Sequence, residues 1–548
     1  MSAIRNAVTY FAITVIWIAV SGCNFTQEKV PEGQGVVSAA SPEAASAGTE
    51  ILEAGGNAVD AAVAVSFALA VTEPAMSGLG GQSQFIIFSP EKGLFTINGT
   101  SYAPARLPAH IAKSDLVRHR AATLPTTLRT LDHAWQKHGS GKISWAKLLE
   151  PAIRFAENGF VIGPFRYRVF KRHAQNLRQS PSTRQLFLNA DGSVPAQGEV
   201  FKQPVLAKTL RRLAEKGGDD FYRGEIASKI AEDMAANGGW ITLQDLRNLP
   251  APVELPALKS RYRQYDVYSL PPPGAGWVVL QILKVLEQTP PADLKIGSAN
   301  RMLRIAEALQ IGHKSRRENP VPDLVNYQNA VKERISQDTA RRLLNEQQQK
   351  DRGETTHFSV VDAEGMVVGV TASINAYFGA KAAHPELGFL YNDYMHEFEA
   401  DTLQHPYALR AGAMPYSSMS PTILVKDGEP CLVLGSPGSA RIISAIVQVI
   451  QLWVDAGLSV QQAVAAPRIH VLPNKRLVLE SASMREKWQA EFENQGYVFQ
   501  TLKSDLALSG LNAYFGGVHA IAKENGQWRG AADPRRDGSV KFAKMTSN

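Results

Sequence analysis

A hairpin predicted near the middle of the chain constrains the fold more than any other stretch. Residues 355–362 and 366–375 are both rich in β-branched and aromatic side chains, as expected of two strands. The segment between them ends in Gly365, which suits a three-residue hairpin loop with glycine in the left-handed position. Counting outward from this loop places Thr355 opposite Ser373, with Cβ atoms about 5 Å apart. Two hydroxyls are therefore predicted to meet at the open end of the hairpin.

The segment before this hairpin is suited to being cut. Residues 345–353 contain three glutamines, a lysine and an arginine but no apolar side chain, so they are predicted to form an exposed loop. A threonine hydroxyl is a weak nucleophile unless a base activates it, and one such base is the threonine's own α-amine at the start of a chain. That chemistry requires a break between Glu354 and Thr355. The alternative is that Thr355 is an ordinary strand residue beneath an exposed loop.

Residues 355–362, Thr-Thr-His-Phe-Ser-Val-Val-Asp, resemble the start of the small subunit of γ-glutamyltransferases, which are N-terminal-nucleophile hydrolases. Six further blocks resemble the same family in the same order: residues 55–65, 77–81, 271–273, 417–422, 435–438 and 533–538. The resemblance implies an α/β fold, a four-layer αββα sandwich built from two fragments of one precursor. It also implies that the first threonine cuts its own chain and then serves as the catalytic nucleophile.

The family resemblance implies a role for each residue of the reaction. Thr355 would attack an amide carbonyl, its amine would take the proton, and Ser373 would orient the pair. The N–H groups of Gly438 and Ser439 would hold the oxyanion, in a loop that leads into a helix starting near Ala440. Backbone N–H groups at a helix start favour a negative oxygen. The family has two consecutive glycines in this loop, so the Cβ of Ser439 narrows the conformations open to it.

The positions that would bind the substrate depart from the family pattern. Thr100 stands where the family has the arginine for the γ-glutamyl α-carboxylate, Glu397 replaces an aspartate, and Tyr394 replaces a glutamine. Three polar residues of the family's substrate site are kept: Asn375, Ser417 and Ser418. A threonine hydroxyl cannot offer the paired, charged donors of a guanidinium. We therefore expect weak turnover of glutathione-like amides, unless another cation such as Lys381 or Arg410 takes over the role.

Three functional hypotheses are open at this point. The first is a self-cleaving γ-glutamyltransferase-type amidohydrolase that passes the γ-glutamyl group of a glutathione-like amide to water or an amine. The second is the same chemistry on another acyl group, without γ-glutamyl preference. The third is an uncut, inactive relative that binds at a surface. The strip of residues 397–417 is short for a lid of this family, which predicts an open cleft.

The first 23 residues have the pattern of a bacterial lipoprotein signal peptide. Arg5 precedes an apolar run at residues 7–20, which is too short to span a bilayer comfortably but suits a signal segment. The run ends in Val-Ser-Gly-Cys, which resembles a lipobox, so Cys23 is predicted to carry a lipid. Asn24 follows it, not the aspartate associated with inner-membrane retention, which favours the outer membrane on the periplasmic side. An ordinary cleaved signal or a short anchor is the alternative.

The chain divides into four predicted parts: a signal at residues 1–23, a polar tether at 24–34, a large-subunit part at 35–354 and a small-subunit part at 355–548. The last two parts are expected to stay together as a heterodimer. Cys431, in a predicted strand, is the other cysteine of the chain, so no disulfide is predicted once Cys23 is acylated.

Composition and spacing argue against several other functions. The chain has 548 residues, of which 44% are hydrophobic and 20% charged, as in a globular protein. A net charge of +7 without a dense lysine or arginine block makes nucleic acid a poor partner. The glycine-rich segment 77–81 precedes a strand, not a helix, so it does not form a phosphate cradle. With no metal-ligand spacing either, no metal or cofactor is predicted, and His357 is expected to be structural.

Overall fold

The computed structural model describes residues 35–544, except residues 322, 344–353, 400–404, 473 and 503. The predicted signal peptide, the tether and the lipid attachment site at Cys23 therefore lie outside the described residues. Within the described part, no helix has both the length and the apolar character needed to cross a membrane.

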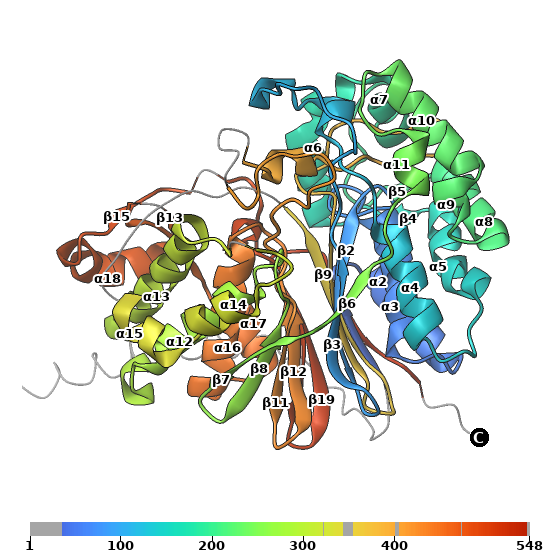
Figure 1. The fold of residues 1–548 in the computed structure, drawn as a ribbon. Helices are drawn as coiled ribbons and strands as arrows, with labels where there is room; N and C mark the ends of the chain where they lie inside the picture. Colours follow the sequence, from blue (N-terminus) through green and yellow to red (C-terminus); the bar gives the residue numbers. More distant parts are fainter. Residues whose placement is uncertain are drawn as a thin grey trace, which may run out of the picture. The chain divides into compact units, whose positions relative to one another are not determined.

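Two antiparallel sheets pack face to face (Figure 1). The strand order of the first sheet is β20-β1-β9-β10-β2-β3-β6, with bounds Ser539–Phe542, Val36–Ala39, Thr356–Val361, Val367–Ser373, Gln82–Ser89, Gly93–Gly99 and Val253–Pro256. The order of the second is β19-β18-β12-β11-β8-β7, with bounds Gln527–Ala532, His519–Glu524, Glu429–Gly435, Thr422–Lys426, Tyr265–Ser269 and Leu258–Tyr262. Apolar side chains from both sheets, among them Val361, Val433 and Ile521, form the layer between them.

Helices lie on the outer face of each sheet (Figure 1). On the side of the first sheet are α2 (Pro42–Glu53), α3 (Ala58–Thr72), α4 (Thr127–His138), α5 (Trp145–Asn158), α6 (Pro164–Arg178), α7 (Pro181–Phe187), α8 (Pro204–Lys216), α9 (Asp220–Arg223), α10 (Glu225–Ala236) and α11 (Leu243–Arg247). On the side of the second are α12 (Gly276–Glu287), α13 (Ala299–Glu318), α14 (Gln328–Arg334), α15 (Gln337–Leu343), α16 (Arg441–Asp455), α17 (Val460–Ala465) and α18 (Ala482–Asn494). Short strands form three smaller pairings: β4 (Phe160–Val161) with β5 (Val200–Phe201); β14 (Arg476–Leu479) with β13 (Ile469–Leu472) and β15 (Val498–Phe499); and β16 (Ala507–Leu508) with β17 (Leu511–Asn512). The fold is the predicted four-layer αββα sandwich.

The predicted hairpin is present as β9 and β10, in the interior of the first sheet. Thr356 pairs with Ala372, so one further step along the ladder places Thr355 opposite Ser373, as the sequence predicts. Gly365 in the loop has a φ of +88°, the left-handed conformation that this loop requires.

Helix α3 runs behind the hairpin and matches it in length. Its 15 residues span about 22 Å, and the six strand steps from Thr356 to Asp362 span about 20 Å. At one end, Oδ2 of Asp362 accepts a 2.9 Å hydrogen bond from the N–H of Ala58. At the other end, Oγ1 of Thr356 donates a 2.9 Å hydrogen bond to Oε2 of Glu73. The helix therefore anchors both ends of the strand that carries the predicted nucleophile.

The two predicted fragments share both sheets. In the first sheet β1, β2, β3 and β6 precede residue 354, whereas β9, β10 and β20 follow it. In the second sheet β7 and β8 precede it, and the other four strands follow. Because β9 lies between β1 and β10, a cut after Glu354 would leave the two fragments hydrogen-bonded to each other. They form one intertwined unit, not two separate domains.

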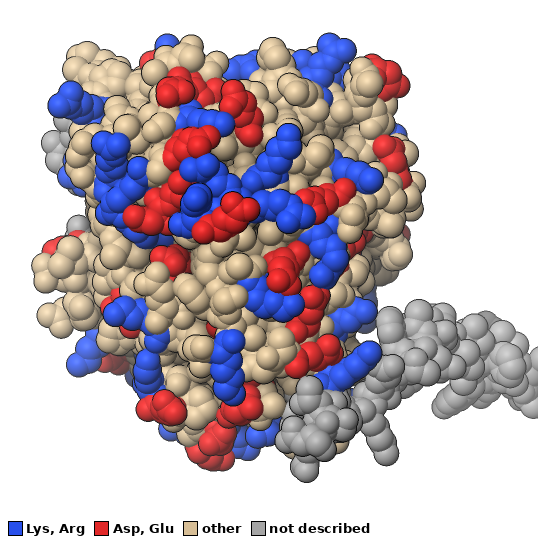
Figure 2. All heavy atoms as spheres, turned by 90° about the vertical axis from the view of Figure 1, so that its right-hand side faces the viewer, with Lys and Arg blue, Asp and Glu red and all other residues tan. Residues whose placement is uncertain are grey.

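Charges of both signs interleave on the face seen from the side of α5 and α8 (Figure 2). Ion pairs between neighbouring helices contribute to this pattern, including Arg211 with Glu157 and Arg154 with Glu50. Such interleaving keeps the local electrostatic potential low.

Candidate active site

The open end of the hairpin holds the peptide bond that the sequence predicts to be cut. Oγ of Ser373 donates a 2.7 Å hydrogen bond to the carbonyl oxygen of Glu354 and accepts one of 2.7 Å from the N–H of Asn375. The carbonyl of Asn375 accepts a 3.0 Å hydrogen bond from the N–H of Glu354. The sequence predicts that Ser373 orients Thr355. In the uncut chain Ser373 instead contacts the scissile carbonyl, which lies next to the Thr355 hydroxyl by covalent connection.

Two arginines hold the side chain of Glu354. Its Oε1 lies 2.6 Å from Nη2 of Arg441, and its Oε2 lies 3.2 Å from Nη2 of Arg536. Nη1 of Arg536 also donates to the carbonyl oxygen of Thr355 at 3.5 Å. The side chains of Arg441 and Arg536 are 12% and 0% exposed. The arginines therefore immobilise both residues of the scissile peptide.

A buried network of charges positions Arg536. The adjacent Arg535 binds both Glu480 and Asp533, and Arg468 lies 2.8 Å from the second carboxylate oxygen of Asp533. Burial by itself raises the pKa of Asp533, but Arg468 and Arg535 outweigh it and hold the pKa well below its usual range. Two positive and two negative groups balance, so the network carries no net charge into the interior. This arrangement gives the sequence block 533–538 a structural role.

The loop before α16 adopts a left-handed conformation at two successive residues. Gly438 has a φ of +117° and Ser439 a φ of +57°. For Ser439 this conformation costs about 1 kcal/mol, because its Cβ crowds the following carbonyl oxygen. The N–H of Arg441 donates to the carbonyl of Gly438 at 3.0 Å and closes the first helical turn. The backbone thus follows the path expected of two glycines, although one of them is a serine.

A small pocket beside Thr355 brings together most of the residues that the sequence assigns to the substrate. It is lined by Glu354, Thr355, Asn375, Tyr394, Glu397, Tyr416, Ser417, Ser418, Met419 and Ser439. Its volume is about 10 Å³. Glu354 and Tyr394 line this small space in the uncut chain. The open cleft expected from the short strip 397–417 stays a prediction, because residues 400–404 lie outside the described part of the chain.

Tyr394 lies against the residues that hold the scissile carbonyl. Its side chain is hydrogen-bonded to those of Ser373 and Gln82, and burial raises its pKa above the usual range. The phenol therefore stays neutral at physiological pH. His357 lies deeper, with Nδ1 2.9 Å from Oγ1 of Thr371 and Nε2 3.1 Å from Oγ of Ser359, as expected of a structural histidine.

The structure does not place Thr100 in this pocket. Thr100 is only 1% exposed. Its hydroxyl donates to Oδ1 of Asn98 at 2.6 Å and accepts from Nε2 of Gln84 at 2.5 Å. The expectation that Thr100 contacts the substrate is therefore corrected, because its hydroxyl already has partners in the first sheet. The two cations considered as substitutes are also elsewhere: Nζ of Lys381 donates to the carbonyl of Gly379 at 2.7 Å, and Arg410 is exposed.

Arg316 borders the pocket, although the sequence gave it no role. From α13, its Nη2 donates to Oγ of Ser418 at 2.8 Å, and its Nε donates to the hydroxyl of Tyr416. The guanidinium also lies over the Tyr416 ring, 4.1 Å from its centroid. An arginine on the buried face of an amphipathic helix was the signal that could have identified it. The hydroxyl oxygen of Ser418 accepts the hydrogen bond from Arg316, so the hydroxyl proton of Ser418 points away from this arginine.

A larger cavity of about 590 Å³ adjoins the pocket, and Glu354 lines both. Arg441, Arg172, Tyr377 and Tyr514 also line this cavity. The Glu354 side chain thus stands between the nucleophile and the larger space.

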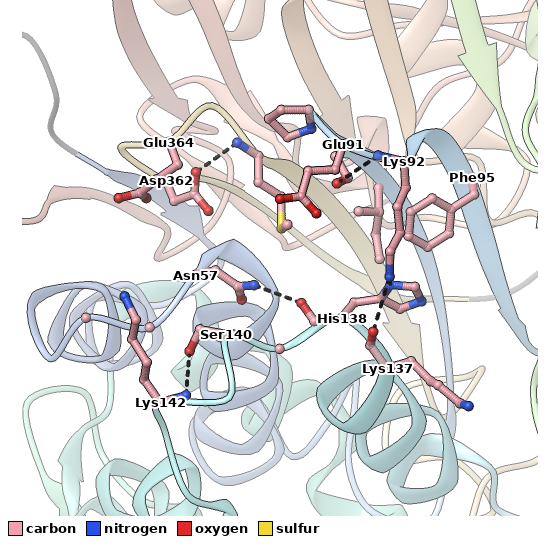
Figure 3. A pocket seen from close by; sticks show the side chains of 17 residues that line it. Asn57, Glu91, Lys92, Phe95, Lys137, His138, Ser140, Lys142, Asp362 and Glu364 are labelled. Carbon is pink, nitrogen blue, oxygen red and sulfur yellow. Dashed lines mark hydrogen bonds between the residues drawn. The ribbon is translucent and has the colours of Figure 1, made fainter.

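A separate cavity of about 520 Å³ lies at the closed end of the hairpin, where Asp362 and Glu364 face a wall that includes Lys92, Lys137 and Lys142 (Figure 3). Asp362 is seven residues from Thr355 along an extended strand, or about 23 Å. This cavity is therefore not part of the candidate active site. Among the described residues, no group of three or more His, Cys, Asp or Glu side chains is arranged to bind a metal.

Comparison with known proteins identifies the family. The family model of gamma-glutamyltranspeptidase matches residues 44–543, almost the whole described region. The chain belongs to the γ-glutamyltransferase family. It is therefore an enzyme of the γ-glutamyltransferase type, an N-terminal threonine amidohydrolase. The sequence blocks that carried the resemblance all fall at or near the site described above or in the elements that support it.

Relatives of two kinds share this family. A glutathione hydrolase proenzyme from Escherichia coli is 35% identical over 80% of this chain and 81% of its own length. An acylase ACY 1 proenzyme from a Pseudomonas species is 32% identical over 94% of this chain and 95% of its own length. Among solved structures, cephalosporin acylase from Bacillus halodurans has a TM-score of 0.82 at 26% identity, covering 94% of this chain and 98% of its own. Gamma-glutamyltranspeptidase from Helicobacter pylori has a TM-score of 0.53 at 28% identity, covering 59% and 93%.

Proposed function

We propose that the chain cuts itself between Glu354 and Thr355, and that the freed Thr355 hydrolyses or transfers the γ-glutamyl group of glutathione-like amides. The observation that carries this proposal is the Ser373 hydroxyl on the Glu354 carbonyl, directly beside the Thr355 hydroxyl. The names of the glutathione hydrolase relatives, which are proenzymes, support both parts of it.

Self-cleavage begins with attack of Thr355 Oγ1 on the carbonyl carbon of Glu354. Negative charge develops on the carbonyl oxygen, where the Ser373 proton stabilises it. Collapse breaks the C–N bond, the hydroxyl proton ends on the Thr355 nitrogen, and an ester links Glu354 to Thr355. Water then hydrolyses the ester. Glu354 gains a terminal carboxylate and Thr355 regains its hydroxyl, beside the α-amine that was freed when the C–N bond broke and that now serves as its base.

Turnover repeats this chemistry on an external amide. The Thr355 amine takes the hydroxyl proton as Oγ1 attacks the substrate carbonyl, and the N–H groups of Gly438 and Ser439 bind the oxyanion. The amine product leaves with a proton, and the acyl-Thr355 ester passes its acyl group to water or to an amine. Asn375, Ser417 and Ser418 line the space where the acyl group binds. No cofactor takes part in this scheme.

A second candidate is the same reaction on an acyl group without γ-glutamyl preference. The specific observation in its favour is that Thr100 replaces the expected arginine and lies outside the pocket. The acylase relatives, which align over almost the full chain, support it as well.

Two measurements test these proposals. On a denaturing gel the purified wild-type protein should run as two fragments, one that ends at Glu354 and one that begins at Thr355. The Thr355→Ala variant should remain a single chain. Rates on a γ-glutamyl anilide and on a plain acyl anilide then separate the two candidates. A wild-type protein that stays a single chain after long incubation, and turns over neither anilide, would overturn both and favour the inactive surface-binding relative.

We also propose that lipidated Cys23 anchors the enzyme to the outer membrane, facing the periplasm. The lipobox-like segment at residues 20–23 and the following Asn24 support this location. Wild-type protein should sediment with outer-membrane vesicles, and Cys23→Ala should be soluble or unprocessed. Equal membrane association of both forms, with the signal retained, would indicate a transmembrane anchor instead.

A further inference from the structure

We propose that Arg441 and Arg536 form a carboxylate-binding subsite of the cleaved enzyme, which Glu354 fills before cleavage and a carboxylate on the substrate's acyl group fills afterwards. The inference rests on the proposed function, since it requires self-cleavage at Glu354. In this proposal Arg441 and Arg536 provide the positive charge for the substrate carboxylate, in place of the family arginine whose position is taken by Thr100.

The contacts of Glu354 show what this subsite binds. Each carboxylate oxygen pairs with a different guanidinium, at 2.6 Å for Arg441 and 3.2 Å for Arg536. Charge-assisted hydrogen bonds of this kind are the strong ones. Two guanidiniums that converge from separate segments on the two oxygens of one carboxylate form a built receptor for that group.

The arginines are fixed independently of Glu354. Arg441 is at the start of α16 and lies over the ring of Tyr514, 4.6 Å from its centroid. Arg536 follows the buried Arg535 network and lies over the ring of Phe165, 4.8 Å from its centroid. Departure of Glu354 would therefore leave both guanidiniums in place.

Burial makes an empty subsite unfavourable. The side chain of Arg536 is fully buried, and breaking a buried ion pair is strongly destabilising because it leaves a charge without its partner. The carboxyl of Glu73 faces Arg536 as well, but it is paired with Thr356 and burial raises its pKa to about 7, so it compensates Arg536 only partly. A substrate carboxylate that enters this position replaces the lost partner.

The length of Glu354 indicates which acyl groups fit. Three carbons separate its scissile carbonyl carbon from its side-chain carboxyl carbon. The same three carbons separate the two carboxyl carbons of any five-carbon dicarboxylic acid, with or without an amino group. An acyl group of this length on Oγ1 of Thr355 can place its free carboxylate in the subsite. The substrate class is therefore the monoamides of five-carbon dicarboxylic acids.

The position of Glu354 also explains how the subsite becomes accessible. Glu354 lines both the small pocket at Thr355 and the cavity of about 590 Å³ that Arg441 also lines. Withdrawal of this one side chain after cleavage joins the two spaces. Self-cleavage would then produce the nucleophile and open its acyl-binding site in a single event.

The experiment compares two anilides of equal shape on the cleaved wild-type enzyme. One carries a glutaryl group with a free carboxylate, and the other carries its terminal amide. We expect kcat/KM for the glutaryl anilide to be about ten- to a hundredfold higher, chiefly through KM, as one charge-assisted contact would produce. Equal kcat/KM for the two would overturn the inference. If the protein cleaves itself but turns over neither of these anilides nor a γ-glutamyl anilide, the proposed function fails instead.

Substitutions of the two arginines test whether their positive charge binds the substrate carboxylate. Arg536→Gln should lower kcat/KM for the glutaryl anilide by about ten- to a hundredfold and change that of the neutral amide less than threefold. Arg247→Gln, a change of an exposed arginine at the end of α11, is the matched control and should change neither. If Arg536→Gln does not mature, Arg441→Gln is the second variant and should lower the ratio of the two kcat/KM values in the same direction, whereas Arg441→Lys, which keeps the charge, should lower it less. A different result would be that the arginine variants lower kcat/KM only for amides whose carboxylate lies on the leaving amine, such as N-valeryl-4-aminobenzoate. That result would overturn the assignment of the subsite to the acyl group.

Discussion

The hydroxyl of Ser373 lies 2.7 Å from the carbonyl oxygen of Glu354, and the N–H of Asn375 fixes its direction by donating to the same hydroxyl oxygen. The Ser373 proton therefore points at the oxygen on which negative charge develops during self-cleavage. The structure thus pairs the nucleophile with a donor on the opposite strand through the register of a single hairpin.

Ser373→Ala should slow self-cleavage by about a hundredfold or more, because one donor to a developing oxyanion contributes roughly that factor. The measurement is the half-time for loss of the full-length band on a denaturing gel. Ser83→Ala is the matched control, since it removes a buried hydroxyl from the adjacent strand β2 without touching the scissile carbonyl. Equal half-times for Ser373→Ala and wild type would show that the contact does not act in cleavage.

Glu354→Ala should also slow self-cleavage, because it releases the scissile peptide from Arg441 and Arg536. Loss of a charge-assisted hydrogen bond predicts an effect of about ten- to a hundredfold. Added acetate or formate should restore part of the rate by filling the space between the two arginines. Chloride at the same ionic strength is the control and should restore less. Absence of any difference between the two salts would contradict a carboxylate-specific site.

Local patterns made the central parts of this fold predictable. The hairpin register follows from a glycine loop and strand periodicity, and α3 begins where Asn57 and Asp60 form a capping box. The loop at Gly438 was recognisable from its family pattern, and its helix begins at Arg441, one residue from the expected position. These features depend on residues close together in the chain, so one sequence contains the information.

The arrangement of the binding site could not be predicted in the same way. Arg441 and Arg536 meet at Glu354 from segments far apart in the chain, and no local pattern records that contact. The family pattern places Thr100 where other members have an arginine. The threonine side chain is shorter than arginine, and its hydroxyl forms hydrogen bonds with the nearby Asn98 and Gln84. The volume of the pocket beside Thr355 depends on whether Glu354 is still bonded to Thr355. Composition and residue spacing do not predict that volume.

Glu73 should make stability depend on pH near neutrality. Burial, the largest influence, raises its pKa from 4.5 to about 7, against the opposing effect of Arg536 and Arg166. In the unfolded chain Glu73 ionises near pH 4.5, whereas in the folded protein it stays protonated until about pH 7. Its contribution to stability is therefore fully present below pH 4.5 and is lost as the pH rises to about 7, by an amount on the order of 3 kcal/mol.

Glu73→Gln removes this titration and keeps an acceptor for the Thr356 hydroxyl. We expect the variant and its parent to melt at similar temperatures at pH 4.5, and the variant to melt about 3 °C higher at pH 8. Both should carry Thr355→Ala, so that each sample is one uncut chain, and melting is followed by circular dichroism across the pH range. Glu491→Gln, an exposed change on α18, should leave the pH profile unaltered. If the Glu73→Gln variant instead melts lower at pH 8, the ion pairing of Glu73 with Arg536 outweighs the cost of burying its charge.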